Sequence, residues 1–163
     1  MSQPMTRFPA LAALVLLGVA GTLGAAACAA APEPPPYKPV ANVKELMEAT
    51  VQPAASVYWN SVATIVTREG VEERFPRNDE EWEAVWGGAI TIAESGNLMM
   101  MSPRAKDGDR EWISLSQQLV NVGELAAKAA LSKDPEAVLG AGEKVYDVCT
   151  RCHMKYIVQD PQS

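Results

Sequence analysis

Cys149-Thr150-Arg151-Cys152-His153 is the stretch around which the chain is organised, and it lies near the C-terminus of the 163-residue sequence. Positions 149, 152 and 153 are three and four residues apart, so on a helix their side chains leave from one face. Two thiols at this spacing can reach the two vinyl groups along one edge of a porphyrin, and the adjacent histidine can then bind the iron. The C-x-x-C-H pattern therefore predicts one covalently attached haem c.

Other uses of a closely spaced cysteine pair fit the sequence less well. A thioredoxin-like redox pair would need a preceding strand within a βαβ pattern, and the sequence shows neither. A zinc site would need further Cys or His ligands, but His153 is the only histidine and Cys28 the only other cysteine. A disulfide inside one helical turn would have poor geometry. Because no acid, base or nucleophile pattern accompanies the motif, we do not expect an enzyme.

The N-terminal residues 1–28 predict an export signal. A polar stretch with a single charge at Arg7 precedes an unbroken run of Ala, Leu, Val, Gly, Thr and Cys over residues 10–31, which is the order of a signal peptide. Three outcomes stay open: cleavage after small residues, cleavage at Cys28 with a lipid on its thiol, and retention as a membrane anchor. A lipid would explain the third cysteine, so we favour a periplasmic protein that is tethered to the membrane through Cys28.

A proline-rich linker follows over residues 29–41. The segment Pro32-Glu33-Pro34-Pro35-Pro36-Tyr37-Lys38-Pro39 cannot form a helix and favours polyproline II. A stiff spacer would hold a domain away from a membrane, and an ordinary disordered remnant of the leader is an equally compatible interpretation.

Residues 42–163 predict an all-α domain, an antiparallel four-helix bundle with haem bound covalently to the C-terminal helix. Apolar residues recur at steps of three and four positions, which predicts helices over 42–67, 79–101, 109–132 and 135–158. Asn78 and Asp134 are predicted N-caps, and Pro53 should kink the first helix. No strand signal competes, and helices of this length joined by short connections can cover one another as a bundle.

Glycine and tryptophan residues in the second and third predicted helices raise further expectations. Gly87 and Gly88 in mid-helix each cost about 1 kcal/mol relative to Ala, which is tolerable where a neighbouring helix or a haem approaches the backbone. Trp82, Trp86 and Trp112 are interpreted mainly as core aromatics. Of these we keep Trp86 as a candidate haem contact.

Charge excludes one class of partner and marks one surface. The net charge of −6 makes nucleic acid an unsuitable partner. Lys144, Arg151 and Lys155 form a basic stripe on the last predicted helix. The stripe could steer an acidic partner or pair with haem propionates, but we favour an ordinary solvated face.

A C-x-x-C-H motif at the end of a four-helix pattern resembles the class II c-type cytochromes, the cytochrome c prime group and its low-spin relatives. The resemblance implies thioether bonds at Cys149 and Cys152, with His153 as the proximal iron ligand. The family usually carries an aromatic residue three positions after the histidine and a basic residue four positions after it. Tyr156 matches the first and joins the candidate haem-binding residues, whereas Ile157 departs from the second.

The family divides according to the sixth iron ligand. In low-spin members a methionine early in the first helix binds the iron and the protein carries electrons; in high-spin members that side is blocked and the iron takes up small gases. Met47 occupies the comparable region, and a methionine from 99–101 or no ligand are the alternatives. The resemblance thus implies a periplasm-facing monohaem cytochrome that passes single electrons to a redox protein partner. The alternative is a five-coordinate haem protein that binds NO or CO. Bundles of this family often pair as homodimers.

Overall fold

The computed structural model describes residues 37–106 and 108–158. The predictions for the export signal at 1–28, for Cys28 and for most of the linker lie outside the described residues. The chain divides into two units, 1–36 and 37–163, and the account below concerns the second. Within its described part, no helix is both long enough and apolar enough to cross a membrane.

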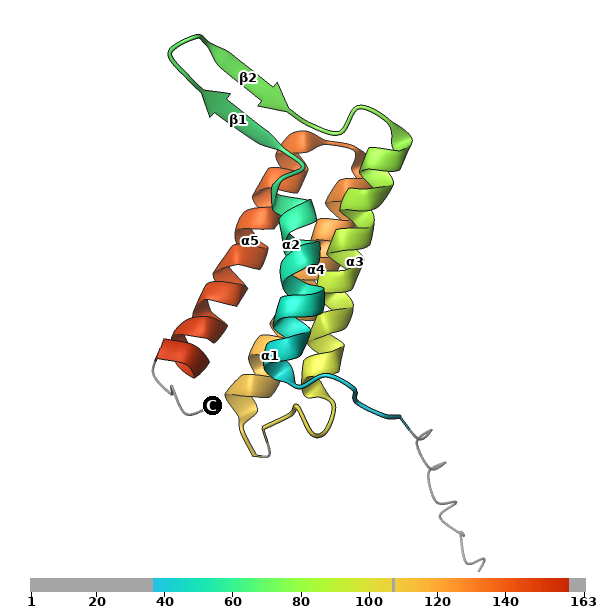
Figure 1. Cartoon of the computed structure of the whole chain (residues 1–163), viewed down its shortest axis with the longest axis vertical. Coiled ribbons are helices and arrows are strands. Elements are labelled where there is room, and N and C mark those ends of the chain that lie inside the picture. Colours follow the sequence, from blue (N-terminus) through green and yellow to red (C-terminus); the bar gives the residue numbers. More distant parts are fainter. Residues whose placement is uncertain (1–36, 107, 159–163) are drawn as a thin grey trace, which may run out of the picture. The chain divides into compact units, whose positions relative to one another are not determined.

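The described residues are mostly helical, and four helical segments pack together (Figure 1). The first segment consists of α1 (Val43–Leu46), a π-helical turn η1 (Met47–Val51) and α2 (Gln52–Trp59). The other three are α3 (Asp79–Met100), α4 (Arg110–Ser132) and α5 (Pro135–His153), and α5 continues into a second π-helical turn, η2 (Met154–Val158). The predicted mostly helical fold with four packed helices is confirmed.

The first helix is shorter than predicted. It ends at Trp59, and an antiparallel hairpin of β1 (Ala63–Val66) and β2 (Val71–Arg74) follows. The predictions of helix up to residue 67 and of no competing strand were therefore wrong. The physical reason is local: residues 64–67 are four consecutive β-branched residues, which lose side-chain freedom in a helix and favour extended backbone.

The hairpin projects past the ends of the helices (Figure 1). Its closing turn depends on Gly70, whose φ of 146° is strained for any residue with a side chain. The backbone N–H of Thr67 donates to the carbonyl of Gly70 across 2.8 Å. Val66 and Val71 pair across the strands and are both exposed. The hairpin therefore adds little to the core.

Polar side chains fix where the helices begin. Asn78 accepts a hydrogen bond from a backbone N–H of the first turn of α3, and Asp109 and Asp134 do the same for α4 and α5. Pro135 occupies the first turn of α5, where its missing N–H costs nothing. Asn42 forms a complete capping box at the start of α1. The predicted caps at Asn78 and Asp134 are thus confirmed.

Pro53 lies within the first helical segment, and the helix continues past it. A proline has no backbone N–H, and its ring crowds the carbonyl four residues earlier. The turn before it is widened into η1, where the backbone N–H of Gln52 donates to the carbonyl of Met47. Wide turns of this kind occur often at functional sites. Here the wide turn contains Met47, the predicted sixth ligand.

Close helix contacts depend on individual glycines. A Cβ added at Gly88 would lie 2.9 Å from the carbonyl oxygen of Ala54 in α2, whereas one added at Gly87 would meet no described atom within 4 Å. The predicted close approach therefore exists at Gly88, and another helix makes it. A Cβ at Gly123 of α4 would lie 2.6 Å from the backbone nitrogen of Ala93 in α3. At this point α3 and α4 meet backbone to backbone.

Candidate functional site

A cavity of about 370 Å³ is lined by all four helical segments. Its volume lies in the range of small-molecule and cofactor sites. Its apolar wall includes aliphatic residues of the first segment, α4 and α5, namely Val51, Ala55, Leu115, Leu119 and Val148. Because these side chains also belong to the core clusters or pack beside them, the helices themselves hold the wall in place.

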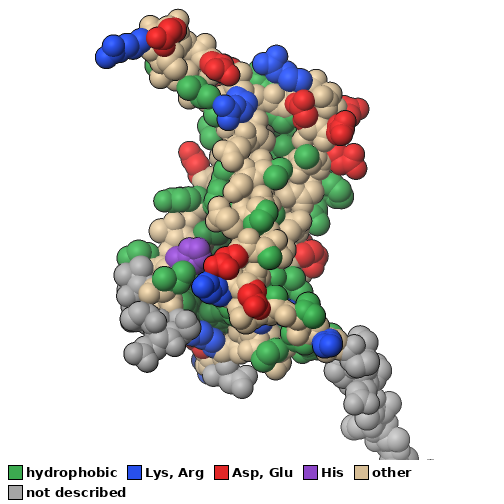
Figure 2. All heavy atoms as spheres, viewed as in Figure 1, with side chains coloured by type: hydrophobic (Ala, Val, Ile, Leu, Met, Phe, Trp, Pro, Cys, Tyr) green, Lys and Arg blue, Asp and Glu red, His purple; other side chains and the backbone are tan. Residues whose placement is uncertain are grey.

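The three residues of the C-x-x-C-H motif lie together on the wall of this cavity. Cys149 and Cys152 are half-buried free thiols on successive turns of α5. His153 is the last residue of α5, and its imidazole is exposed (purple in Figure 2). The helical spacing of the motif thus brings two sulfurs and one imidazole to the same space, as the sequence predicts.

Both thiols have raised pKa values. Burial, helped by the neighbouring Cys152 sulfur, raises the pKa of Cys149 to about 11. Burial and the nearby Glu111 carboxylate raise the pKa of Cys152. Thiols that exchange disulfides depend on a lowered pKa, because the thiolate is the nucleophile. The raised pKa values therefore disfavour the thiolate form, which is the form that reacts in disulfide exchange.

Three methionines line the cavity with the motif, and two of them, Met47 and Met99, are predicted iron ligands; the third, Met154, directly follows His153. Met47 enters from η1 and Met99 from the end of α3. Met99 is 3% exposed, and its carbonyl accepts a hydrogen bond of 2.9 Å from the indole N–H of Trp112. Of the run 99–101, only Met99 is among the described lining residues. The structure thus leaves two candidate sulfur ligands, and Met99 is the more firmly held.

Tyr156 lies behind the cavity rather than on its wall. It is buried in a core cluster with Leu46, Met99 and Trp112, and Cys152 packs against the same cluster. The burial of its phenol raises the pKa of Tyr156, and the hydrogen bond to Asp109 raises it further. Tyr156 and Cys152 thus belong to the same packed region, and haem contact by Tyr156 stays a prediction.

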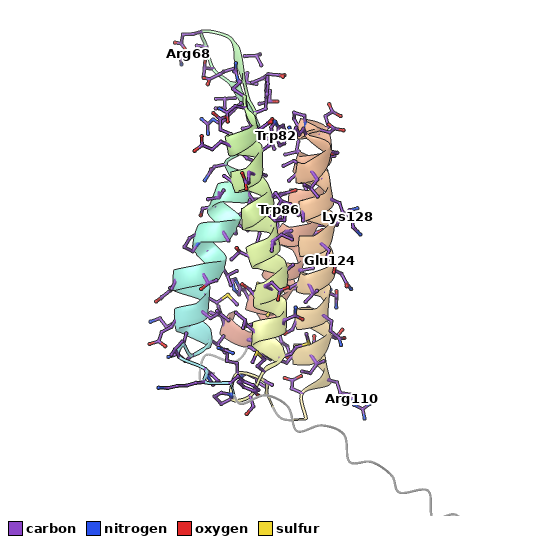
Figure 3. The ribbon with its side chains drawn as sticks, turned by 90° about the vertical axis from the view of Figure 1, so that its right-hand side faces the viewer. Arg68, Trp82, Trp86, Arg110, Glu124 and Lys128 are labelled. Carbon is purple, nitrogen blue, oxygen red and sulfur yellow. The ribbon has the colours of Figure 1, made fainter. Side chains whose placement is uncertain are left out.

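Trp86 lies away from the motif. It lines a separate pocket of about 330 Å³ with Trp82 and Lys133. Figure 3 shows Trp82 and Trp86 in the half of α3 nearer the hairpin, far along the bundle from Arg110. The structure therefore does not bring Trp86 together with the motif residues, and its predicted haem contact stays a prediction.

The basic stripe is largely engaged with α4. The Arg151 guanidinium donates to the amide oxygen of Gln118 at 2.8 Å. Lys155 pairs with Glu111 at 2.8 Å, which raises the pKa of the lysine through a hydrogen bond and through charge. Lys144 is exposed. Two of the three basic side chains therefore join α5 and η2 to α4 at the surface, and a role toward an acidic partner or haem propionates stays a prediction.

Sequence reasoning missed two aromatic residues on the cavity wall. Trp59 and Tyr146 meet edge to face with ring centroids 6.1 Å apart, and both line the cavity. The indole N–H of Trp59 donates to the carbonyl of Gly142 at 3.1 Å, which joins α2 to α5. Tyr146 is three residues before Cys149, so helical spacing could have placed it with the motif. Trp59 carried no such signal.

Comparisons with known proteins assign no class to the chain. No family model matches it, no curated protein matches it, and no solved structure matches it. Within residues 37–106 and 108–158, no group of three or more His, Cys, Asp or Glu side chains could hold a bare metal ion.

Proposed function

We propose that the protein is a monohaem c-type cytochrome that carries single electrons. Cys149 and Cys152 would form the thioether bonds, and His153 would bind the iron. The observation that carries the proposal is that two thiols, one imidazole and the sulfurs of Met47 and Met99 line a single apolar cavity. The chemistry supplied by bound haem is one-electron exchange between ferric and ferrous iron.

The residues of the cavity fit such a group. Both cysteines leave the same face of α5, and His153 follows directly, so all three can serve one macrocycle edge and its iron. Leu115 and Leu119 of α4 face the same space and would keep water from the macrocycle. Their low polarity would disfavour additional charge on the iron and so help to set its potential.

Our proposal extends to the class of fold and the location of the protein. We propose the antiparallel bundle of the class II c-type cytochromes, with haem on its last helix, because the motif ends the last of four packed helices. We further propose export to the periplasm and a lipid tether at Cys28, on the sequence of the first 28 residues. The partner would then be another redox protein.

The proposal is tested by asking whether haem is covalently attached to the protein. The full chain, expressed in cells that attach haem c, should give a pyridine haemochrome and keep its colour in acidic acetone. Replacing both motif cysteines (Cys149→Ala with Cys152→Ala) should abolish this attachment. Cys28→Ala is the matched control, since it removes a cysteine outside the motif and should leave the haem in place. A colourless wild-type protein, or one that loses its pigment to the acid, would contradict the proposal.

Gas binding is the second candidate function. Val51, Leu115 and Leu119 are apolar residues on the cavity wall, and if neither methionine reached the iron they would leave one coordination position free. A high-spin ferrous spectrum that changes on addition of NO or CO would support this function. A low-spin spectrum that is indifferent to both gases would exclude it.

A further inference from the structure

Side-chain contacts to α4 flank His153 on both sides in the sequence. They are Arg151 to Gln118, Lys155 to Glu111 and Tyr156 to Asp109, each at 2.8 Å. One contact thus comes two residues before the histidine, and the other two come just after it. Because η2 begins immediately after His153, the contacts fix the chain at the point where the helix changes type.

The contact between Tyr156 and Asp109 is the most buried of these. The phenol O–H donates to one carboxylate oxygen of Asp109 at 2.8 Å, and the other oxygen accepts the backbone N–H groups of Glu111 and Trp112 at 3.0 Å. A single carboxylate therefore starts α4 and holds η2. The ring of Tyr156 also packs edge to face on Trp112, with centroids 5.0 Å apart.

The protonation states strengthen this contact. Backbone donation from Trp112 and the hydrogen bond from Tyr156 lower the pKa of Asp109. Burial and the same carboxylate raise the pKa of Tyr156. At neutral pH the acceptor is therefore an anion and the donor a neutral phenol. Hydrogen bonds to a charged group are roughly twice as strong as neutral ones.

The imidazole of His153 has no hydrogen-bond partner among the residues that the structure describes. A histidine that binds a metal generally donates its second ring N–H to a carboxylate or carbonyl, which fixes the ring. Within residues 37–106 and 108–158, the His153 side chain makes no hydrogen bond, and it is exposed. The position of the ring is therefore set by the backbone of α5 and η2 that carries it.

We propose that Tyr156 and Asp109, with the Lys155–Glu111 pair as a second link, are positioning residues that hold His153 against the iron. This inference rests on the proposed function. The pairs act from behind the cavity, through the backbone, and take the place of a direct hydrogen bond to the imidazole. Losing the link should let the histidine withdraw and weaken its bond to iron.

The first experiment compares Tyr156→Phe and Asp109→Asn with the wild-type holoprotein. Both changes keep size, and asparagine is as good an N-cap as aspartate. Tyr58→Phe is the matched control, because it also removes a buried phenol, one that donates to the carbonyls of Ala126 and Val138 at 3.3 Å away from the motif.

The measurements are the reduction potential and the ferric electron paramagnetic resonance spectrum. Electron donation by the histidine stabilises ferric iron, so a weaker bond between His153 and the iron should raise the reduction potential. Each tenfold loss of preference for the ferric state corresponds to a rise of about 59 mV. Loss of a supporting residue typically costs about 10- to 100-fold. We expect Tyr156→Phe and Asp109→Asn to raise the reduction potential and to broaden the resonance spectrum, and we expect Tyr58→Phe to change neither.

Two further measurements separate positioning from general stability. Hydrogen exchange of the backbone amides of 154–158 in the holoprotein should speed up in Tyr156→Phe and stay unchanged in Tyr58→Phe. At the second link, Lys155→Gln should shift the potential in the same direction, and Lys155→Arg should restore it by keeping the ion pair.

The outcomes distinguish this inference from the proposed function. A wild-type protein without covalent haem would overturn both. Covalent haem together with unchanged potential and resonance spectra in Tyr156→Phe and Asp109→Asn would overturn only the positioning role. The positioning role would also be overturned if Tyr58→Phe shifted the reduction potential as much as Tyr156→Phe does.

Discussion

Replacement by alanine should have opposite effects on stability at two adjacent glycines of α3. Gly87→Ala adds a methyl group to a position with no described atom within 4 Å. It should stabilise the protein by about 1 kcal/mol, the helix-propensity difference between alanine and glycine. Gly88→Ala gains the same propensity, but its Cβ would lie 2.9 Å from the carbonyl oxygen of Ala54, a backbone atom that cannot rotate away.

The size of the difference follows from that contact. Forcing an extra methyl group into a tight interface typically costs about 1–3 kcal/mol. The net effect of Gly88→Ala should therefore lie between about zero and 2 kcal/mol of destabilisation, and the two variants should differ by about 1–3 kcal/mol. At roughly 4 °C per kcal/mol for a domain of this size, thermal unfolding should resolve them.

The assay is thermal and denaturant unfolding of the holoprotein, followed by far-ultraviolet circular dichroism. Gly87→Ala serves as the control within the same helical turn. If haem is bound as proposed, the Gly88 variant should also alter its absorption spectrum, because pushing α2 away from α3 moves Ala55 and Trp59 on the cavity wall. If both variants were equally stabilised, α2 and α3 would not lie as close as Gly88 indicates, and the reasoning would fail.

Further predictions concern the sulfur ligands, a buried phenol and acid stability. If Met99 is the sixth ligand, Met99→Ala should convert a low-spin spectrum to a high-spin one and Met47→Ala should not; the reverse result would identify Met47. Tyr58→Phe removes a buried O–H that is shared between two carbonyl oxygens at 3.3 Å and should cost about 1–2 kcal/mol in denaturant unfolding; an unchanged midpoint would show that the phenol contributes nothing. The pKa of Asp109 is lowered in the folded state, so its stabilisation is present above the ordinary carboxyl pKa of 3.8 and is lost as pH falls through the folded value. Unfolding free energy measured between about pH 5 and pH 2 should therefore fall less steeply in Asp109→Asn, and equal slopes would count against the assignment.

The helices could be predicted because their signals are local. Asn78, Asp109 and Asp134 each satisfy backbone N–H groups within their own first turn, so the sequence alone fixes where α3, α4 and α5 begin. The hairpin was missed because Val62 and Ile65 are three residues apart, and that spacing fits a helix. The β-branched run 64–67 and the turn at Gly70 decide otherwise.

The candidate site could be predicted only as far as helical spacing reaches. Cys149, Cys152 and His153 are neighbours on one helix, so their common face follows from the sequence. The placement of Met99 and Trp86 depends on which end of α3 meets which helix, and tertiary packing decides that. Asp109 was recognised as a helix start, but its second role toward Tyr156 joins residues 47 positions apart and needs the fold.

The backbone contact between α3 and α4 at Gly123 has a consequence for the proposed electron transfer. Two helices that touch without intervening side chains cannot slide past each other without a clash, and they bear Met99 and Leu115 on the cavity wall. When a bound group gains or loses one electron, the polar groups of this wall would reorient very little. A small rearrangement of the surroundings lowers the barrier to electron transfer in either direction, so this contact would keep the exchange fast and reversible.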